Sequence, residues 1–260
     1  MLKKIPVALT IAGSDSGGGA GIQADLKTFA LFGVHGASAI ACLTAQNPAR
    51  VLAIGACRPK MLRLQLEAVF QEIPPSAIKT GMLFSRRNVS VVADFLKDTQ
   101  APLVVDPVMI ATSGARLLGS SALKALMEKL LPLATLVTPN VPEAEVLSGR
   151  RISAMEDMDD AARRIHSEFG CGVLVKGGHL RSGRATDIFY NGKSPLILSA
   201  PFVTGIRTHG TGCVYSAAIC AALALGQGLS EAVQTGKKFV TRGIRQSYRI
   251  GKHFALGPIS

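Results

Sequence analysis

The sequence predicts an α/β fold, doubly wound around a mostly parallel sheet, in a single domain spanning residues 1–260. First, short apolar runs alternate with stretches of helical periodicity along almost the whole chain. Second, several apolar runs end on glycine or on a polar side chain, as strands do at the ligand-binding edge of a parallel sheet. Third, no repeat, low-complexity segment or linker interrupts the alternation, and a hydrophobic fraction of 48% supplies a core.

The formal net charge of +12 suggests anionic ligands. Part of this charge recurs at helical spacing at Lys238, Arg242, Arg245 and Arg249, and no acidic residue follows Glu231. We expect this basic face to be solvated, because it lacks the aromatic interleaving and the motifs of nucleic-acid-binding proteins.

Five cysteines are an odd number without a C-x-x-C pair, so we expect neither a disulfide framework nor a zinc cluster, and a cytoplasmic location. No apolar run approaches the roughly 18 residues that cross a bilayer. The N-terminal apolar stretch Ile5–Ala12 faintly resembles a signal peptide, but a glycine-rich segment follows it at once. We therefore interpret it as a first buried strand.

The N-terminal segment predicts a strand, a glycine loop and a helix in succession. Val7–Ala12 is the strand, Gly13–Gly21 is a loop with five glycines, and apolar positions every three or four residues mark a helix from Ile22. Such a βα unit cradles a ligand at the carboxyl end of its strand. Neither a P-loop nor a G-x-G-x-x-G followed by an acidic residue is present, which disfavours a nicotinamide cofactor.

Ala37–Leu43 is predicted as the next strand, with regular structure stopping at Pro48. Gln46 then sits at a strand end, where its carboxamide suits the edge of a neutral heterocycle or stabilises the loop itself. These two interpretations stay open at this point.

The following elements are a helix over Pro59–Phe70, a strand over Ala77–Thr80 and a helix over Arg87–Leu96. Met82 lies in the turn after the strand. Its flexible thioether could lie against a flat ring or fill a gap in the core.

Two strands then end on oxygen ligands. The apolar run Leu103–Met109 contains Asp106, and Thr135–Thr138 runs into Asn140 and Glu143. These groups suit a hydrated Mg²⁺ that carries phosphates. Asn140 could equally cap the next helix, with Glu143 in its first turn, and the two roles are compatible.

After a helix over Asp157–Phe169, the strand Gly172–His179 delivers Lys176 onto a double glycine. A compact cation beside open backbone amides is typical of a phosphate site. Ala185–Tyr190 and Pro195–Ala200 then predict a hairpin.

The segment Thr208–Cys213, Thr-His-Gly-Thr-Gly-Cys, precedes a run of small apolar residues that stops at Gly226. Backbone amides at such a helix start hold anions, phosphates above all. Cys213 on the first turn would face the bound anion, or it would be an inert cysteine of a core helix. A last helix is expected over Ser230–Ser247.

Taken together, seven motifs resemble those of the hydroxymethylpyrimidine/phosphomethylpyrimidine kinases, the thiamine-pathway members of the ribokinase-like superfamily. They span nearly the whole chain in the expected order. The motifs are GSDSGGGAGIQAD at 13–25, TAQN at 44–47, KTGML at 79–83, VDPVM at 105–109, TPNVPEAE at 138–145, VKGGH at 175–179 and HGTGC at 209–213.

This resemblance implies a ribokinase-like fold, a homodimer, and the substrate ATP used with Mg²⁺. It also implies two successive phosphorylations of 4-amino-5-hydroxymethyl-2-methylpyrimidine, first to the monophosphate and then to the diphosphate, in thiamine biosynthesis. Partners other than these small molecules, whether a nucleic acid or a membrane, are not expected. We also expect no fused thiamine-phosphate synthase.

The resemblance assigns site residues position by position. Those of the pyrimidine pocket are Asp25, Gln46 and Met82, lined by Ala20, Val108 and Gly13. Lys176, Asn140 and Thr211 are assigned to ATP binding, and Asn140 and Glu143 to the metal side. The strand-end pattern adds Asp106 to the metal side.

The anion hole is matched to Gly210, Thr211 and Gly212, with Lys176 beside it and Cys213 as the catalytic base. We expect the helix N-terminus to favour a thiolate at Cys213, which takes the proton of the hydroxyl group. Ribokinases proper usually carry aspartate at this position, so the cysteine points to the pyrimidine and vitamin B6 branch.

Three alternatives remain open on the sequence. Pyridoxal kinase is the nearest, because pyridoxal is another flat heterocyclic alcohol and some relatives handle both substrates. A regulatory protein that binds a nucleotide or a vitamin without catalysis is disfavoured, because it need not retain Lys176, Glu143 and Cys213 together. A nucleic-acid binder that uses the basic face is the third.

Overall fold

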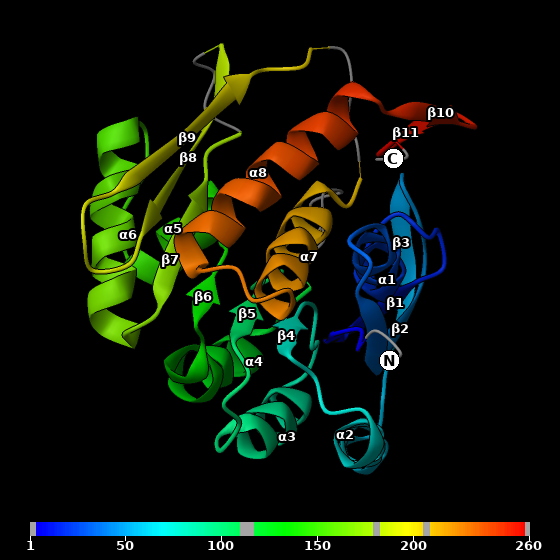
Figure 1. Cartoon of the computed structure of the whole chain (residues 1–260). Coiled ribbons are helices and arrows are strands. Elements are labelled where there is room, and N and C mark those ends of the chain that lie inside the picture. Colours follow the sequence, from blue (N-terminus) through cyan, green and yellow to red (C-terminus); the bar gives the residue numbers. More distant parts are fainter. Residues whose placement is uncertain (1–3, 110–116, 179–182, 205–208, 258–260) are drawn as a thin grey trace.

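A nine-stranded sheet is the middle layer of the computed structural model, which describes residues 4–109, 117–178, 183–204 and 209–257 (Figure 1). The strand order is β3-β2-β1-β4-β5-β6-β7-β8-β9. The strands are β1 Val7–Asp15, β2 His35–Asn47, β3 Arg50–Ala56, β4 Ala77–Thr80, β5 Leu103–Val105, β6 Leu136–Val137, β7 Gly172–Lys176, β8 Arg184–Tyr190 and β9 Leu196–Pro201.

The strands from β2 to β7 in this order run parallel, whereas β3 at one edge and β8 and β9 at the other pair antiparallel to their neighbours. The mostly parallel α/β sheet predicted from the sequence is therefore confirmed.

The central strands are apolar on both faces because helices cover both. In β1, Leu9 and Ile11 belong to one hydrophobic cluster and Ala8 to the cluster on the other side. In β5, Val105 belongs to the same cluster as Leu9, and Val104 belongs to the same cluster as Ala8. This alternation along continuous apolar runs is typical of a parallel sheet buried between two helical layers.

Helices α2 to α6 contribute residues to the first cluster, and helices α1, α7 and α8 contribute residues to the second. The helices α1, α7 and α8 lie together on one side of the sheet in Figure 1. The α-helices are α1 Gly21–Leu31, α2 Pro59–Glu72, α3 Arg86–Leu96, α4 Ser120–Ala125, α5 Val141–Ser148, α6 Met155–Phe169, α7 Thr211–Ala224 and α8 Leu229–Arg245. The segments Leu126–Leu130 and Leu131–Leu133 continue α4 as π and 3-10 turns. Among the described helices, none is both long and apolar enough to cross a membrane.

Several elements differ from the expectation. Strand β1 continues through Gly13 to Asp15, so the expected loop over Gly13–Gly21 begins only after Asp15. Strand β7 ends at Lys176, short of the end expected at His179.

Strand β2 continues to Asn47 and returns as β3, so Pro48 lies in the turn of a hairpin rather than at the end of regular structure. Strand β5 ends at Val105, because Asp106 already turns toward its own partners.

The last helix ends at Arg245, and the chain then forms the hairpin of β10 Tyr248–Ile250 and β11 His253–Ala255. Arg249 therefore lies on β10 and not on the helix face with Lys238 and Arg242, which corrects the expected spacing. All three side chains are exposed, in agreement with a solvated surface.

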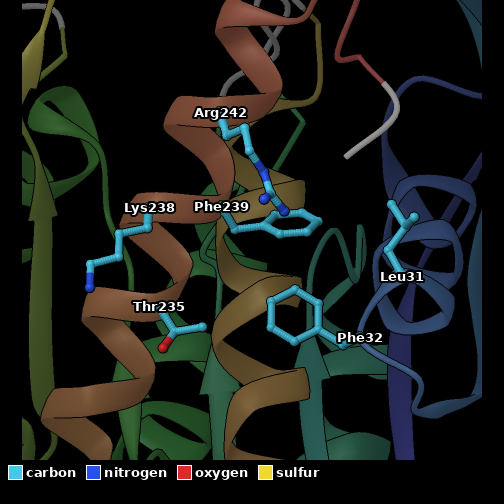
Figure 2. Close-up of a pocket in the computed structure, with 6 residues that line it drawn as sticks. All are labelled: Leu31, Phe32, Thr235, Lys238, Phe239 and Arg242. Carbon is cyan, nitrogen blue, oxygen red and sulfur yellow. The ribbon is translucent and has the colours of Figure 1, made fainter. Parts of the chain in front are cut away.

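A cavity of about 320 Å³ lies beside this surface, between the end of α1 and the middle of α8 (Figure 2). The rings of Phe32 and Phe239 line it with their centroids 4.8 Å apart, and Figure 2 shows the Lys238 side chain pointing away from them. The cavity adjoins the C-terminal end of α1, whereas the glycine loop precedes the N-terminal end of that helix. It therefore lies at the other end of α1 from the glycine loop. Its lining residues are Leu31, Phe32, Thr235, Lys238, Phe239 and Arg242.

Candidate active site

Parallel strands bring polar side chains that are far apart in the sequence to one edge of the sheet. Asp15 is the last residue of β1, and Lys176 is the last residue of β7. Gln46 is the last residue but one of β2, and Asp106 follows β5 directly. Because the carboxyl ends of parallel strands share one edge, the sheet itself assembles these groups.

The two glycine loops meet at this edge, backbone against backbone. Asp15 organises the first loop by accepting hydrogen bonds from the amides of Gly17 (2.8 Å), Gly19 (3.1 Å) and Ala20 (2.8 Å). Gly210, at φ 83°, is the N-cap residue just before α7, and a Cβ there would overlap the carbonyl oxygen of Gly19. Only glycine fits this left-handed, crowded position.

The starts of α1 and α7 therefore lie side by side. In the described part of the chain, no side chain caps either helix at Ala20 or Gly210. The two helix starts therefore direct the positive ends of both helix dipoles to the same region. This arrangement suits an anion such as a phosphate.

Lys176 and Asp106 form an ion pair under the first turn of α7. The lysine Nζ lies 3.0 Å from Oδ1 of Asp106, which also accepts a 3.3 Å bond from Thr138, and Ser216 on α7 donates to Oδ2 at 3.2 Å. A Cβ on Gly212 would stand 3.2 Å from the Lys176 Nζ. The missing side chain at Gly212 thus lets the ammonium group approach the helix start closely.

Each member of this ion pair stabilises the charged form of the other. Burial opposes the ionised form of Asp106, but the ammonium groups of Lys176 and Lys79 hold its pKa below the usual value. Burial likewise opposes the cation at Lys176, but Asp106 and then Glu143 raise its pKa. The Lys176 side chain is still 14% exposed, so a phosphate can reach it.

Asn140 and Glu143 form a capping box at the start of α5. The Asn140 Oδ1 accepts a 3.0 Å bond from the Glu143 amide, and Glu143 Oε2 accepts a 3.0 Å bond from the Asn140 amide. The other carboxylate oxygen, Oε1, accepts from the amide of Met109 at 3.0 Å. The capping role predicted for these two residues is confirmed.

These contacts decide how a divalent cation fits. Burial raises the pKa of Glu143 beyond what the charge of Lys176 offsets, and neighbouring Asp106 raises it further. Two buried carboxylates against one lysine leave negative charge that a cation would relieve. Yet their oxygens already accept internal bonds, and no three Asp, Glu, His or Cys side chains gather into a ligand cluster among the described residues. The residues fit Mg²⁺ that keeps water and substrate oxygens as most of its ligands.

Cys213 is half-buried on the first turn of α7. Burial raises the pKa of its thiol to about 11, although Lys79 and the amide of Gly21 favour the thiolate. The carboxylates of Asp25 and Asp106 add to the rise. The expectation of a thiolate favoured by the helix N-terminus is therefore corrected: at neutral pH the resting thiol is protonated, because burial outweighs the nearby positive charge.

Asp25 lies behind the site rather than on its surface. It is fully buried, and its two oxygens accept hydrogen bonds from Lys79, both at 2.8 Å, and from Thr10 at 2.6 Å. The structure thus buries Asp25 against Lys79 and Thr10, whereas its place in the pyrimidine pocket, expected from the resemblance, stays a prediction. Sequence reasoning missed Lys79 as its partner, although the lysine begins the KTGML motif.

Met82 and Val108 lie in one small apolar cluster with Cys42 and Leu117, onto which Phe84 packs. Val108 (φ 43°) and Phe84 (φ 67°) are the two non-glycine residues with positive φ in the described chain. Such strained backbone concentrates at ligand sites.

Gly13 borders the same cluster, because a Cβ there would meet the Cys42 sulfur at 2.8 Å and the Cβ of Met82 at 3.8 Å. Ala20, the residue before α1, is only half-buried. The structure thus brings Met82, Val108 and Gly13 together, whereas Ala20 lies beside Gly210 and Asp25 is buried against Lys79.

Gln46 lies across the glycine loop from His209, the residue before Gly210. The Nε2 atoms of the two side chains are 3.4 Å apart, and the His209 Nε2 is also 3.3 Å from Oδ2 of Asp15. Burial alone would raise the pKa of Asp15. The hydrogen bonds with His209 and with the amides of Gly17 and Ala20 outweigh burial and lower this pKa. Sequence reasoning did not single out His209, and only its place in the HGTGC motif signalled it.

Two predicted motif positions, Thr208 and His179, lie outside the described residues. Thr211 is described, at the first position of α7 beside Gly212.

Comparison with known proteins gives consistent matches over nearly the whole chain. The family profile described as phosphomethylpyrimidine kinase matches residues 15–259. Hydroxymethylpyrimidine/phosphomethylpyrimidine kinase of Synechococcus elongatus is 45% identical over 98% of this chain and 97% of its own length. The thiamine biosynthesis bifunctional protein ThiED of Geobacter sulfurreducens is 46% identical over 97% of this chain, which spans about half (51%) of that longer relative.

Solved structures give the same fold. Bacillus subtilis pyridoxal kinase in an ADP complex superposes with a TM-score of 0.91 at 37% identity, covering 98% of this chain and 97% of its own. Phosphomethylpyrimidine kinase of Clostridium difficile gives a TM-score of 0.81 at 43% identity, covering 92% and 98%. The ribokinase-like architecture expected from the motifs is therefore confirmed.

Proposed function

The chain belongs to the phosphomethylpyrimidine kinase family, and on that premise we propose that it phosphorylates a hydroxymethylpyrimidine with ATP in thiamine biosynthesis. The first reaction gives the monophosphate and the second converts the monophosphate to the diphosphate. The observation that carries this proposal is the close approach of Lys176 to Gly212 at the start of α7, with Cys213 as the next residue on the first turn of that helix.

The proposed phosphoryl-transfer site consists of this helix start and Lys176. Phosphoryl transfer requires alignment of the reacting oxygens and stabilisation of charge that spreads over the transferring group. Backbone amides of Gly210, Thr211 and Gly212 would donate to that group, and the Lys176 ammonium would approach it from below the helix. ATP is the proposed donor, since the related pyridoxal kinase of Staphylococcus aureus has a structure with AMP-PCP and pyridoxal.

Asn140, Glu143 and Asp106 are the proposed residues on the metal side. They would orient the water ligands of Mg²⁺ through their carboxylate and amide oxygens. When bound, the ion would neutralise part of the charge on the ATP phosphates.

Cys213 is the proposed base of the first reaction. The alcohol loses its proton as its oxygen attacks the γ-phosphorus of ATP, the bond to ADP breaks, and the thiolate of Cys213 receives the proton. In the second reaction the nucleophile is already an ionised phosphate, so it needs little help from a base. Its charge would be held by the paired starts of α1 and α7.

The pyrimidine is proposed to lie beside Met82 and Val108, with Gly13 and Ala20 along its edge and the Gln46 carboxamide at its polar end. Asp25 acts indirectly in this proposal, by keeping Lys79 buried near Cys213. The cluster of apolar side chains around two strained residues supports this assignment.

Pyridoxal is a second candidate acceptor. The close superposition on pyridoxal kinases, with TM-scores of 0.90–0.91 for the nucleotide complexes, favours it. We therefore propose phosphorylation of pyridoxal as a side activity at the same site.

We also propose that residues 1–260 form one domain, that the protein is a homodimer and that it is located in the cytoplasm. The hairpin of β2 and β3 exposes Leu43 (60%) and Leu52 (62%), which supports association of two copies through an apolar surface. Light scattering after gel filtration measures the oligomeric state directly.

The experiment that tests the function measures ADP release with hydroxymethylpyrimidine, with pyridoxal and with no acceptor, each at saturating ATP and Mg²⁺. We expect the highest kcat/KM with the pyrimidine and a small background without acceptor. Turnover with pyridoxal alone would overturn the primary assignment in favour of the second candidate.

A further inference from the structure

His209 lies between a charged carboxylate and the proposed ring-binding amide. Its Nε2 is 3.3 Å from Asp15 Oδ2 and 3.4 Å from Gln46 Nε2, while its other ring nitrogen, Nδ1, is buried without a hydrogen-bond partner among the described residues. One imidazole nitrogen thus faces two polar side chains from β1 and β2.

The carboxylate decides which nitrogen carries the proton. Asp15 is held ionised by His209 and by the amides of Gly17 and Ala20, which lower its pKa. A bare lone pair on Nε2 at 3.3 Å would repel this carboxylate, whereas an N–H there is attracted to it. Neutral imidazole carries one N–H, so Nε2 is the donor and Nδ1 the bare nitrogen.

A donor at Nε2 in turn fixes the carboxamide of Gln46. The Nε2 N–H that points to Asp15 also lies within reach of the Gln46 carboxamide, and one N–H can be shared between two acceptors. The amide NH₂ is itself a donor and cannot be the second acceptor, whereas the amide oxygen can. A half-turn of the carboxamide exchanges these two atoms without changing its shape, and it relieves the contact between nitrogens at 3.4 Å.

We propose that His209 is a positioning residue, which holds the Gln46 oxygen toward the imidazole and turns the NH₂ group toward the substrate. The site then selects a ring that presents a hydrogen-bond acceptor, such as a pyrimidine nitrogen, at this edge. This inference rests on the proposed function, because the ring is that of the proposed acceptor.

The protonation pattern is tested without any turnover. Nitrogen-15 NMR of the whole protein labelled at histidine distinguishes a protonated Nε2 from a protonated Nδ1, and the His209→Gln variant identifies the signal. The proposal expects protonation at Nε2, and it expects that Asp15→Asn weakens this preference. Protonation at Nδ1 alone in the wild type would overturn the proposal, because Nε2 would then accept from the Gln46 NH₂.

A double-mutant cycle tests the coupling to substrate. We expect His209→Ala to lower kcat/KM for hydroxymethylpyrimidine about tenfold, the effect of losing one oriented buried hydrogen bond, with KM for ATP unchanged. In a Gln46→Ala background the same change should have almost no further effect, because His209 acts through that amide. His209→Gln, which keeps a side-chain donor, should recover part of the loss.

Equal losses in both backgrounds, or a rise in KM for ATP, would show that His209 only supports the start of α7 and would overturn the proposal. His35→Ala is the matched control, because His35 is exposed at the opposite end of β2. If the wild-type enzyme does not use the pyrimidine at all, the proposed function fails while the NMR result still reports on His209, so the two failures are distinguishable.

Discussion

The protonation state of Cys213 leads to the most specific prediction. Burial raises the pKa of this thiol to about 11, so only about one molecule in 10⁴ carries the thiolate at pH 7. If the thiolate takes the alcohol proton, kcat of the first reaction should rise about tenfold per pH unit between pH 7 and 9. The second reaction should change little over this range, because its nucleophile is already ionised.

Two substitutions separate the base from a packing residue. Cys213→Ser keeps the shape but offers a much poorer base, so the first reaction should fall by about 10²–10⁴-fold. Cys213→Asp should retain more activity than serine and lose the pH slope, since a carboxylate is ionised throughout this range.

The assay follows both phosphorylations separately at saturating ATP, with the pyrimidine alcohol or its monophosphate as the acceptor. Folding of each variant is checked by its thermal unfolding. A serine variant with near-normal kcat in the first reaction, or a flat pH profile in the wild type, would refute the role of Cys213 as a base. Equal losses with both acceptors would instead indicate a packing role.

Three further predictions concern the ring, the buried ion pair and the basic surface. Gln46→Ala should weaken pyrimidine binding by about 1–3 kcal/mol, because it removes a buried hydrogen-bond partner, while ATP binding is retained. Unchanged kinetics for the pyrimidine would remove Gln46 from the pocket. Asp25→Asn should destabilise the fold by about 3–5 kcal/mol in denaturant unfolding, because it leaves Lys79 buried without its counter-charge. A loss below about 1 kcal/mol, the value of a surface pair, would show that Lys79 finds another partner. Reversing the charge of Lys238 and Arg249 should leave kinase activity within a few-fold, and tight salt-sensitive DNA binding that this variant loses would contradict a solvated surface.

Much of the fold follows from the sequence because burial on both faces leaves a clear record. The strand expected at Ala77–Thr80 matches β4, and the one expected at Gly172–His179 begins where β7 begins and extends beyond its end at Lys176. The small apolar run after Gly210 matches α7. The hairpin strand β3 leaves no such record, because most of its side chains are exposed at the edge of the sheet. Its residues therefore lack the burial pattern that identifies a strand.

The candidate site was predictable in position but not in charge state. Strand ends place Asp106 and Lys176 at one edge for topological reasons that the sequence pattern conveys. The burial of Asp25 against Lys79 depends on a contact across 54 positions, which no local pattern encodes. The raised pKa of Cys213 likewise results from burial and from the charges of Asp25 and Asp106, which lie far from it in the sequence, whereas the sequence pattern indicates only the dipole of α7.

The central claim is that one site phosphorylates a hydroxymethylpyrimidine twice. Phosphorus-31 NMR of the enzyme with hydroxymethylpyrimidine, Mg²⁺ and excess ATP tests it most directly. We predict that the monophosphate signal rises first and then falls as the diphosphate appears, and that Lys176→Ala suppresses both signals. ATP consumption without any phosphorylated pyrimidine, or accumulation of the monophosphate with no diphosphate, would contradict the account.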